Sequence, residues 1–142
     1  MFSSALLSVV LMVATSATAQ LGRPAELRPI VEPAARCVAQ PYLSVAVTGF
    51  TPPRNGSVEL VVSIRGETSG EVRELGRVAI FPAQRFASDL TGAQRFGFNV
   101  PKRFVSQPAV VVVALEPAAG SSDAARATIG EARIGAGPGG RC

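Results

Sequence analysis

Residues 57–64 read Ser-Val-Glu-Leu-Val-Val-Ser-Ile, and this stretch decides the fold class. Its apolar side chains Val58, Leu60, Val62 and Ile64 alternate with other residues, so in an extended chain they share one face. The same period of two recurs in three further segments: Leu43, Val45 and Val47; Val78 and Ile80; and Phe96, Phe98 and Val100. We also expect a strand covered on both faces over Val110–Leu115, and a weaker last strand over Ile129–Ile134.

Turn signals separate these segments. Residues 51–56 carry two prolines and an Asn-Gly pair, which predicts a turn, and residues 66–70 do the same for the next connection. Gly76 interrupts the alternation and predicts a β-bulge, while Pro117–Ser122 closes the strand before it. About six to eight short strands at this spacing, without an amphipathic helix, predict an all-β fold, an antiparallel β-sandwich over residues 41–134. A small barrel is the alternative.

The ends of the chain differ from this centre. An apolar run from Ala5 to Ala14 leads to Ala17-Thr18-Ala19, which predicts a signal peptide over residues 1–19, cleaved before Gln20. An uncleaved anchoring segment is the alternative. Residues 20–40 hold three prolines without regular apolar spacing and are expected to form a Pro-rich arm outside the core. Residues 135–142 form a Gly-rich tail ending in Cys142. We therefore expect a secreted or periplasmic protein with no stable membrane span after signal cleavage.

The two cysteines, Cys37 and Cys142, both lie beyond the expected cleavage position. An even number of cysteines in an exported chain favours a disulfide, which here would tie the arm to the tail. A redox-active or metal-binding thiol pair is the alternative, although there is no Cys-x-x-Cys spacing and no third ligand beside them.

The residue types that the sequence lacks exclude several classes of catalytic and metal site. The 142 residues contain no histidine and no tryptophan, and both methionines, Met1 and Met12, fall in the expected signal peptide. Histidine zinc sites, blue-copper sites and Ser-His-Asp or Cys-His catalysis are excluded for want of their ligands and bases. We therefore expect no catalytic residues, no metal site and no cofactor.

The net charge of +4 comes almost entirely from arginine, which supplies 13 of the 14 basic residues. The arginines are scattered from Arg23 to Arg141, so nucleic-acid binding is not expected.

Arginine and phenylalanine recur together in one part of the chain. Ala83-Gln84-Arg85-Phe86 is repeated as Ala93-Gln94-Arg95-Phe96, and Lys102-Arg103-Phe104 follows. One interpretation is a patch for an anionic partner made by Arg85, Arg95, Lys102 and Arg103. The other, which we prefer, places Phe86, Phe96 and Phe104 in the core and the arginines in water.

Carboxylates offer the remaining enzymatic option. Glu71 with Glu74, or Asp89 with a glutamate brought near by folding, would form an acid–base pair, but their spacing is equally that of an exposed, solvated face. Asn55-Gly56-Ser57 matches the N-glycosylation pattern, and we interpret it as part of a turn.

Four segments in order resemble a known family: Val45–Phe50, Val58–Val62, Leu75–Phe81 and Gln94–Val100. Their pattern of strands and glycines is similar to the small C-terminal β-sandwich of tyrosinase and haemocyanin-type proteins. In that family the sandwich packs over a separate helical domain that holds two coppers by histidines. Because this chain has neither that domain nor any histidine, the resemblance implies an isolated sandwich module that covers or partners another protein.

We therefore expect an exported, non-catalytic β-sandwich module that acts by protein–protein interaction or as an accessory subunit. Another exported protein is the expected partner, and the oligomeric state is left open. The alternatives are a structural envelope component and a cofactor-free hydrolase that uses carboxylates.

Overall fold

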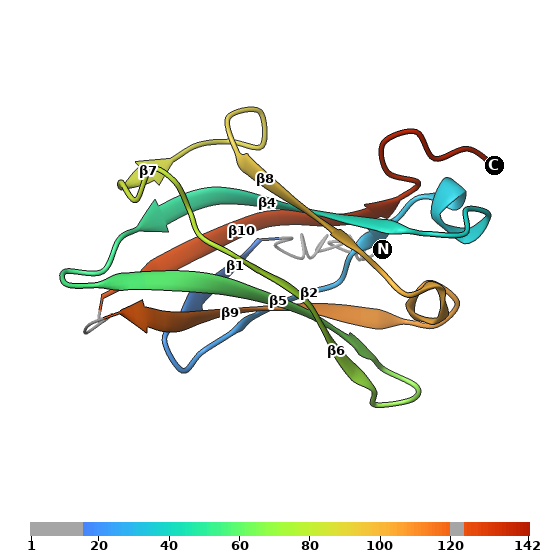
Figure 1. Cartoon of the computed structure of the whole chain (residues 1–142), viewed down its shortest axis with the longest axis horizontal. Coiled ribbons are helices and arrows are strands. Elements are labelled where there is room, and N and C mark those ends of the chain that lie inside the picture. The colour runs from blue at the N-terminus through green and yellow to red at the C-terminus, as the bar shows by residue number, and fades with distance from the viewer. Residues whose placement is uncertain (1–15, 120–123) are drawn as a thin grey trace, which may run out of the picture.

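The computed structural model describes residues 16–119 and 124–142 and is built almost entirely from strands (Figure 1). The strands are β1 (Ala17–Gln20), β2 (Ala25–Leu27), β3 (Ile30–Val31), β4 (Tyr42–Thr51), β5 (Ser57–Gly66), β6 (Val72–Val78), β7 (Phe86–Ala87), β8 (Gln94–Asn99), β9 (Ala109–Ala119) and β10 (Arg126–Gly135). Two short 3-10 helices, η1 (Pro33–Arg36) and η2 (Lys102–Phe104), complete the described elements.

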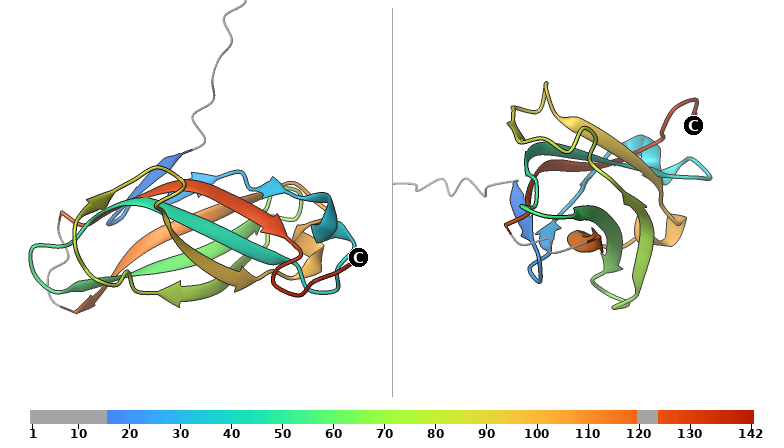
Figure 2. Two further views of the ribbon diagram at one scale, coloured as in Figure 1. Left: turned by 90° about the horizontal axis from the view of Figure 1, so that it is seen from above. Right: turned by 60° about the vertical axis from the view of Figure 1, so that its left-hand side comes forward.

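The strands form two facing sheets, which confirms the predicted all-β sandwich (Figure 2). Sheet A has the order β1-β10-β4-β7, with β3 also on β10 and β8 also on β4, whereas sheet B has the order β2-β9-β5-β6. All pairs are antiparallel except β3 with β10. The described chain has ten strands rather than about six to eight, and β4, β5, β9 and β10 are 10 or 11 residues long.

The core lies between the two sheets and uses the alternating residues of the sequence. Leu43, Val45 and Val47 of β4 are at most 1% exposed, and they face Val58, Leu60, Val62 and Ile64 of β5 across the sandwich core. β9 alternates in the same way: Val111, Val113 and Leu115 point inward, and Val112 and Ala114 are only half-buried. The expectation that β9 is covered on both faces was therefore wrong, because no third layer of described residues lies outside sheet B.

The predicted Pro-rich arm is part of the sandwich, which corrects the expectation for residues 20–40. β2 pairs with β9 in sheet B, and Ala25 and Leu27 are buried in the core. β3 then returns to sheet A and pairs with β10. Three prolines obscured these strands, but Pro24 and Pro29 lie just outside β2 and β3, where no ladder hydrogen bond needs their missing N–H.

The expected cleavage position before Gln20 falls inside β1. Residues 1–15 of the predicted signal peptide lie outside the described residues, but Ala17–Ala19 pair with Ile129–Ala127 of β10. Ala19 is fully buried in the core. Cleavage at that position would thus remove most of a strand and leave the edge of β10 without its neighbour.

The predicted weak last strand, β10, is instead central in sheet A. Ile129 and Ile134 are fully buried, but the inward phase shifts from Ile129 to Ala132 because Gly130 is left out of the pairing. Thr48 of β4 is likewise left out of the pairing between β4 and β10. It lies close to Gly130, since a Cβ on Gly130 would be 2.5 Å from the Thr48 methyl. These two neighbouring bulges interrupt the alternation of inward and outward residues. The alternation in the sequence therefore predicted only a weak strand where β10 lies.

Other predicted connections are mostly confirmed. The turns at residues 51–56 and 66–70 join β4 to β5 and β5 to β6, with positive φ at Gly56 and Gly70. The pairing of β5 with β6 shifts beside Gly76, where the Phe98 ring lies so close that a Cβ would be 2.9 Å from it. β9 continues through Pro117 to Ala119, however, because Pro117 lies at a register shift where a missing N–H is tolerated.

We expect a chain that begins at Gln20 to be less stable than one that begins at Ser16. Loss of β1 exposes the apolar surface now covered by Ala19 and by its neighbours on β10, which costs about 1–2 kcal/mol of unfolding free energy. Urea unfolding of the two chains measures this difference. Thr18→Ala in the longer chain is the control, since Thr18 is exposed and its loss removes no core contact. Equal stability of the two chains would mean that β1 is not part of the fold.

Candidate functional site

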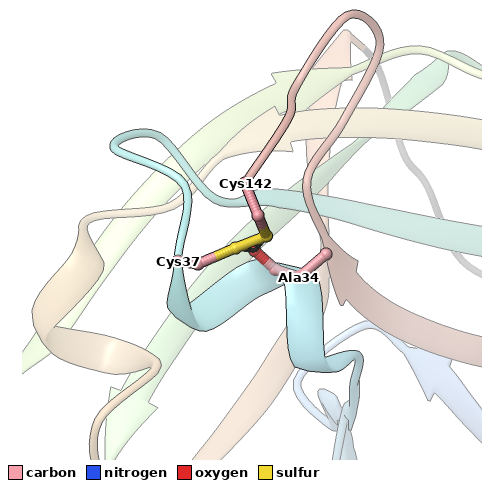
Figure 3. The surroundings of a disulfide bond; sticks show 3 residues. All are labelled: Ala34, Cys37 and Cys142. Carbon is pink, nitrogen blue, oxygen red and sulfur yellow. Dashed lines mark hydrogen bonds between the residues drawn. A yellow bond between two sulfur atoms is a disulfide. The ribbon is translucent and has the colours of Figure 1, made fainter.

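A disulfide joins Cys37, just after η1, to Cys142, as the sequence predicted (Figure 3). The two Cα atoms are 5.4 Å apart and the residues are separated by 105 positions. Both sulfurs lie beside the carbonyl oxygen of Ala34 in η1, at 3.3 and 3.9 Å. The bridge therefore ties the Gly-rich tail that follows β10 to η1, at the end of the sandwich where η2 also lies (Figure 2).

The four residues of the predicted anionic-partner patch are not brought together. Arg85 precedes β7 and Arg95 lies near the start of β8, where its guanidinium donates a hydrogen bond to the Leu90 carbonyl at 3.1 Å. Lys102 and Arg103 are in η2, beyond the other end of β8. The aromatic residues follow the preferred interpretation, since Phe104 is 1% exposed and Phe86 and Phe96 pack against the core.

Arg103 already has a carboxylate partner within the chain. Its guanidinium forms a two-armed ion pair with Glu71 of the β5–β6 turn, with N–O distances of 2.6 and 2.9 Å. It also lies 5.0 Å from the centre of the Phe104 ring. The hydrogen bond from Arg103 lowers the pKa of Glu71.

The other carboxylates are committed in a similar way. Every glutamate in the described residues forms an ion pair: Glu26 with Arg65; Glu67 with Arg28; Glu71 with Arg103; Glu59, Glu74 and Glu116 with Arg77; and Glu32 and Glu131 with Arg133. Asp89 accepts hydrogen bonds from the backbone N–H groups of Thr91 and Gly92. A general acid needs a raised pKa, whereas Glu26 and Glu71 have lowered pKa values because Arg65 and Arg103 donate to them. The geometry gives the carboxylate-hydrolase alternative no support.

The ion pairs determine which cations remain free. In the described residues, five arginines form all the ion pairs with the glutamates. Lys102 and the other eight arginines form none: Arg23, Arg36, Arg54, Arg73, Arg85, Arg95, Arg126 and Arg141. These exposed pairs add little to stability, because both partners are solvated. Their main effect is to leave the surplus positive charge on a defined set of side chains.

Sequence reasoning missed Phe81, the most exposed aromatic residue in the part of the chain that the structure describes. Phe81 is 87% exposed, on the loop of residues 79–85 between β6 and β7, which we call the Phe81 loop. The alternation of Val78 and Ile80 ends there, since Ile80 is buried and the next residue, Phe81, points to solvent before a cis bond to Pro82. An aromatic residue that falls out of phase next to a proline is the only signal the sequence offered.

A surface hollow lies next to Phe81 and contains an unpaired cation. It measures about 280 Å³ and is lined by Pro82, Gln84, Arg85, Phe86, Ala87, Ser88, Gly92 and Gln94. We call it the β7 hollow. Arg85 lines the hollow, and the exposed Phe81 directly precedes its first lining residue, Pro82. Aromatic residues and arginine are the residue types that protein-binding surfaces favour.

The described residues contain no group of three or more Cys, Asp or Glu side chains placed to hold a metal ion. None of their helices has the length and apolar character to cross a membrane.

Comparisons with protein-family models, with curated proteins and with solved structures give no match to this chain. Its function is therefore inferred from its own geometry.

Replacing both Cys37 and Cys142 by Ser should lower the unfolding free energy by about 2–4 kcal/mol, because the bridge restricts a long loop of the unfolded chain. Urea unfolding under oxidising conditions measures the change. The wild-type protein with its disulfide reduced should match the double variant. An unchanged midpoint would contradict a stabilising role for the bridge.

Arg103→Ser should raise the pKa of Glu71 toward its ordinary value of 4.5, because it removes the hydrogen bond that lowers it. A carbon-13 NMR titration of the carboxyl group measures this, with Arg54→Ser as a charge-matched control. Since the folded-state pKa is lowered, the pair stabilises the protein above the unfolded pKa, and this contribution is lost as the pH falls through the folded value. A Glu71 pKa unmoved in Arg103→Ser would refute the assigned pair.

Proposed function

We propose that this chain is an exported, non-catalytic binding module that docks on another exported protein through the Phe81 loop and the β7 hollow. The observation that carries the proposal is the 87% exposure of Phe81 beside a hollow lined by the unpaired Arg85. Burying an aromatic ring that water now surrounds supplies a large free energy of association.

The neighbouring side chains support a localised contact. Leu90, 40% exposed, lies on the turn between β7 and β8, whose Gly92 also lines the β7 hollow. Phe86, which lines the hollow, packs against Phe50 of β4 at a ring-centre distance of 6.5 Å, and this contact helps to hold β7 on β4. A rigid base under exposed apolar residues lowers the entropy cost of binding.

Export is part of the proposal. The disulfide fits an oxidising compartment, since such bridges are rare where thiols are kept reduced. The resemblance to the C-terminal sandwich of tyrosinase and haemocyanin-type proteins supports the same kind of role, because there the sandwich covers another domain. An accessory subunit of this kind needs no catalytic residues of its own.

The test is capture of a partner from the envelope fraction with the wild-type protein and with Phe81→Ser. We expect one stoichiometric partner, and binding weakened by about 2 kcal/mol, about thirtyfold, when the ring is removed. Val72→Ser is the matched control, because Val72 is also apolar and 62% exposed but lies on β6.

Arg85→Ser should weaken the same complex and make its affinity less sensitive to salt. If no stoichiometric partner is captured, or if Phe81→Ser and Val72→Ser bind it equally well, this docking surface is wrong. A structural envelope role would then be the better description.

A further inference from the structure

A second surface, far from the Phe81 loop, has cationic side chains without an ion pair next to apolar side chains. At the end of the sandwich that carries η1 and η2, a hollow of about 390 Å³ is lined by Arg28, Pro29, Val31, Arg36, Phe104, Val105, Ser106, Gln107, Pro108 and Ala109. A smaller hollow of about 110 Å³ shares Arg36, Val105 and Ser106 with it and adds Lys102. We call the two together the η groove. The three shared residues show that the two hollows adjoin.

The floor of the η groove is apolar and firmly held. Phe104 is 1% exposed, Val105 5% and Ala109 8%, so their side chains belong to the core and offer only a small surface to the groove. The backbone N–H groups of Phe104 and Val105 donate to Pro101 and Lys102, which fixes η2. The disulfide fixes the opposite wall, because Cys37 directly follows Arg36. The shape is thus formed before any ligand arrives.

The charge of the groove is not neutralised by the protein. Arg36 on η1 and Lys102 on η2 form no ion pair among the described residues. Their neighbours Arg28 and Arg103 are each held by a glutamate, Glu67 and Glu71, at 2.6 Å. Glu67 and Glu71 therefore pair with other cations. Arg36 and Lys102 flank an apolar hollow without a carboxylate partner among the described residues.

We propose that the η groove binds an anionic amphiphile, with its carboxylate or phosphate between Arg36 and Lys102 and its aliphatic chain along the half-buried Pro29 and Val31 and the exposed Pro108. A guanidinium and an ammonium both pair with either headgroup, while the apolar floor gains nothing from a bare anion. This surface is separate from the β7 hollow and does not depend on the proposed function.

The ligand chemistry is tested by calorimetric titration of the full chain with four probes. Decanoate and decyl phosphate carry both chain and charge; acetate and inorganic phosphate carry the charge alone. We expect at least one of the two amphiphiles to bind at least tenfold more tightly than its short counterpart, and more weakly as salt rises. Binding of one amphiphile identifies the headgroup. No amphiphile binding, or equal binding of the short anions, would overturn the proposal.

The location is tested by paired variants. Arg36→Ser with Lys102→Ser should weaken the bound amphiphile at least tenfold. Arg54→Ser with Arg126→Ser is the matched control, since it removes two arginines that also form no ion pair with another described residue. Arg126 pairs in register with Thr51 at one end of β4, whereas η2 follows Asn99, which pairs with Tyr42 at the other.

We expect both pairs of substitutions to leave the fold intact, because all four side chains are exposed and form no ion pair with a described residue, and equal urea midpoints verify this. Ser106→Trp should also weaken binding, because an indole on this exposed position fills the smaller hollow. Equal weakening in both double variants would mean that net charge alone attracts the probe, and the η groove would then be rejected.

Discussion

The pairing of β4 with β10 is the interaction on which the rest of the molecule depends. β10 carries β1 and β3 on its other edge, and β4 carries β7 and β8, so every strand of sheet A is attached through this pair (Figure 1). The facing bulges at Thr48 and Gly130 bend it and turn Phe50 and Ile134 inward at its two ends. Because β3 leads directly to η1 and β10 to the tail, the same pair also positions Cys37 and Cys142 for their bridge.

The charge distribution follows from that framework rather than from composition. Two ion pairs of sheet B cross an intervening strand: Glu26 of β2 reaches over β9 to Arg65 of β5, and Glu116 of β9 reaches over β5 to Arg77 of β6. The net charge of +4 therefore resides on individual cations that form no ion pair with another described residue. Arg85 lies at one surface hollow and Arg36 with Lys102 at another, and each is next to apolar side chains that a bound molecule would cover.

Much of the fold could be predicted where local pattern and burial agree. The alternation in β4 and β5 identified core residues, and the Asn-Gly pair identified their turn. The interpretation failed where tertiary contacts override local pattern. β2 and β3 are two or three residues long and flanked by prolines, so no periodicity marks them, yet the edges of β9 and β10 stabilise them. The exposure of Phe81 was equally hidden, because an apolar residue in a β-rich sequence is expected inside.

By itself, the sequence determined the fold class, the disulfide and the absence of histidine chemistry, because alternation, the number of cysteines and residue inventory are local or compositional properties. Only the tertiary structure decided which arginines are free and where they lie. The residues of the predicted patch are separated by the length of β8: Arg85 and Arg95 lie before or near its start, and Lys102 and Arg103 follow its end. Arg36 and Lys102, distant in sequence, line one groove because the paired strands place η1 and η2 at the same end of the sandwich. Charge in a sequence is a sum, whereas recognition depends on which charges the packed strands leave unpaired and side by side.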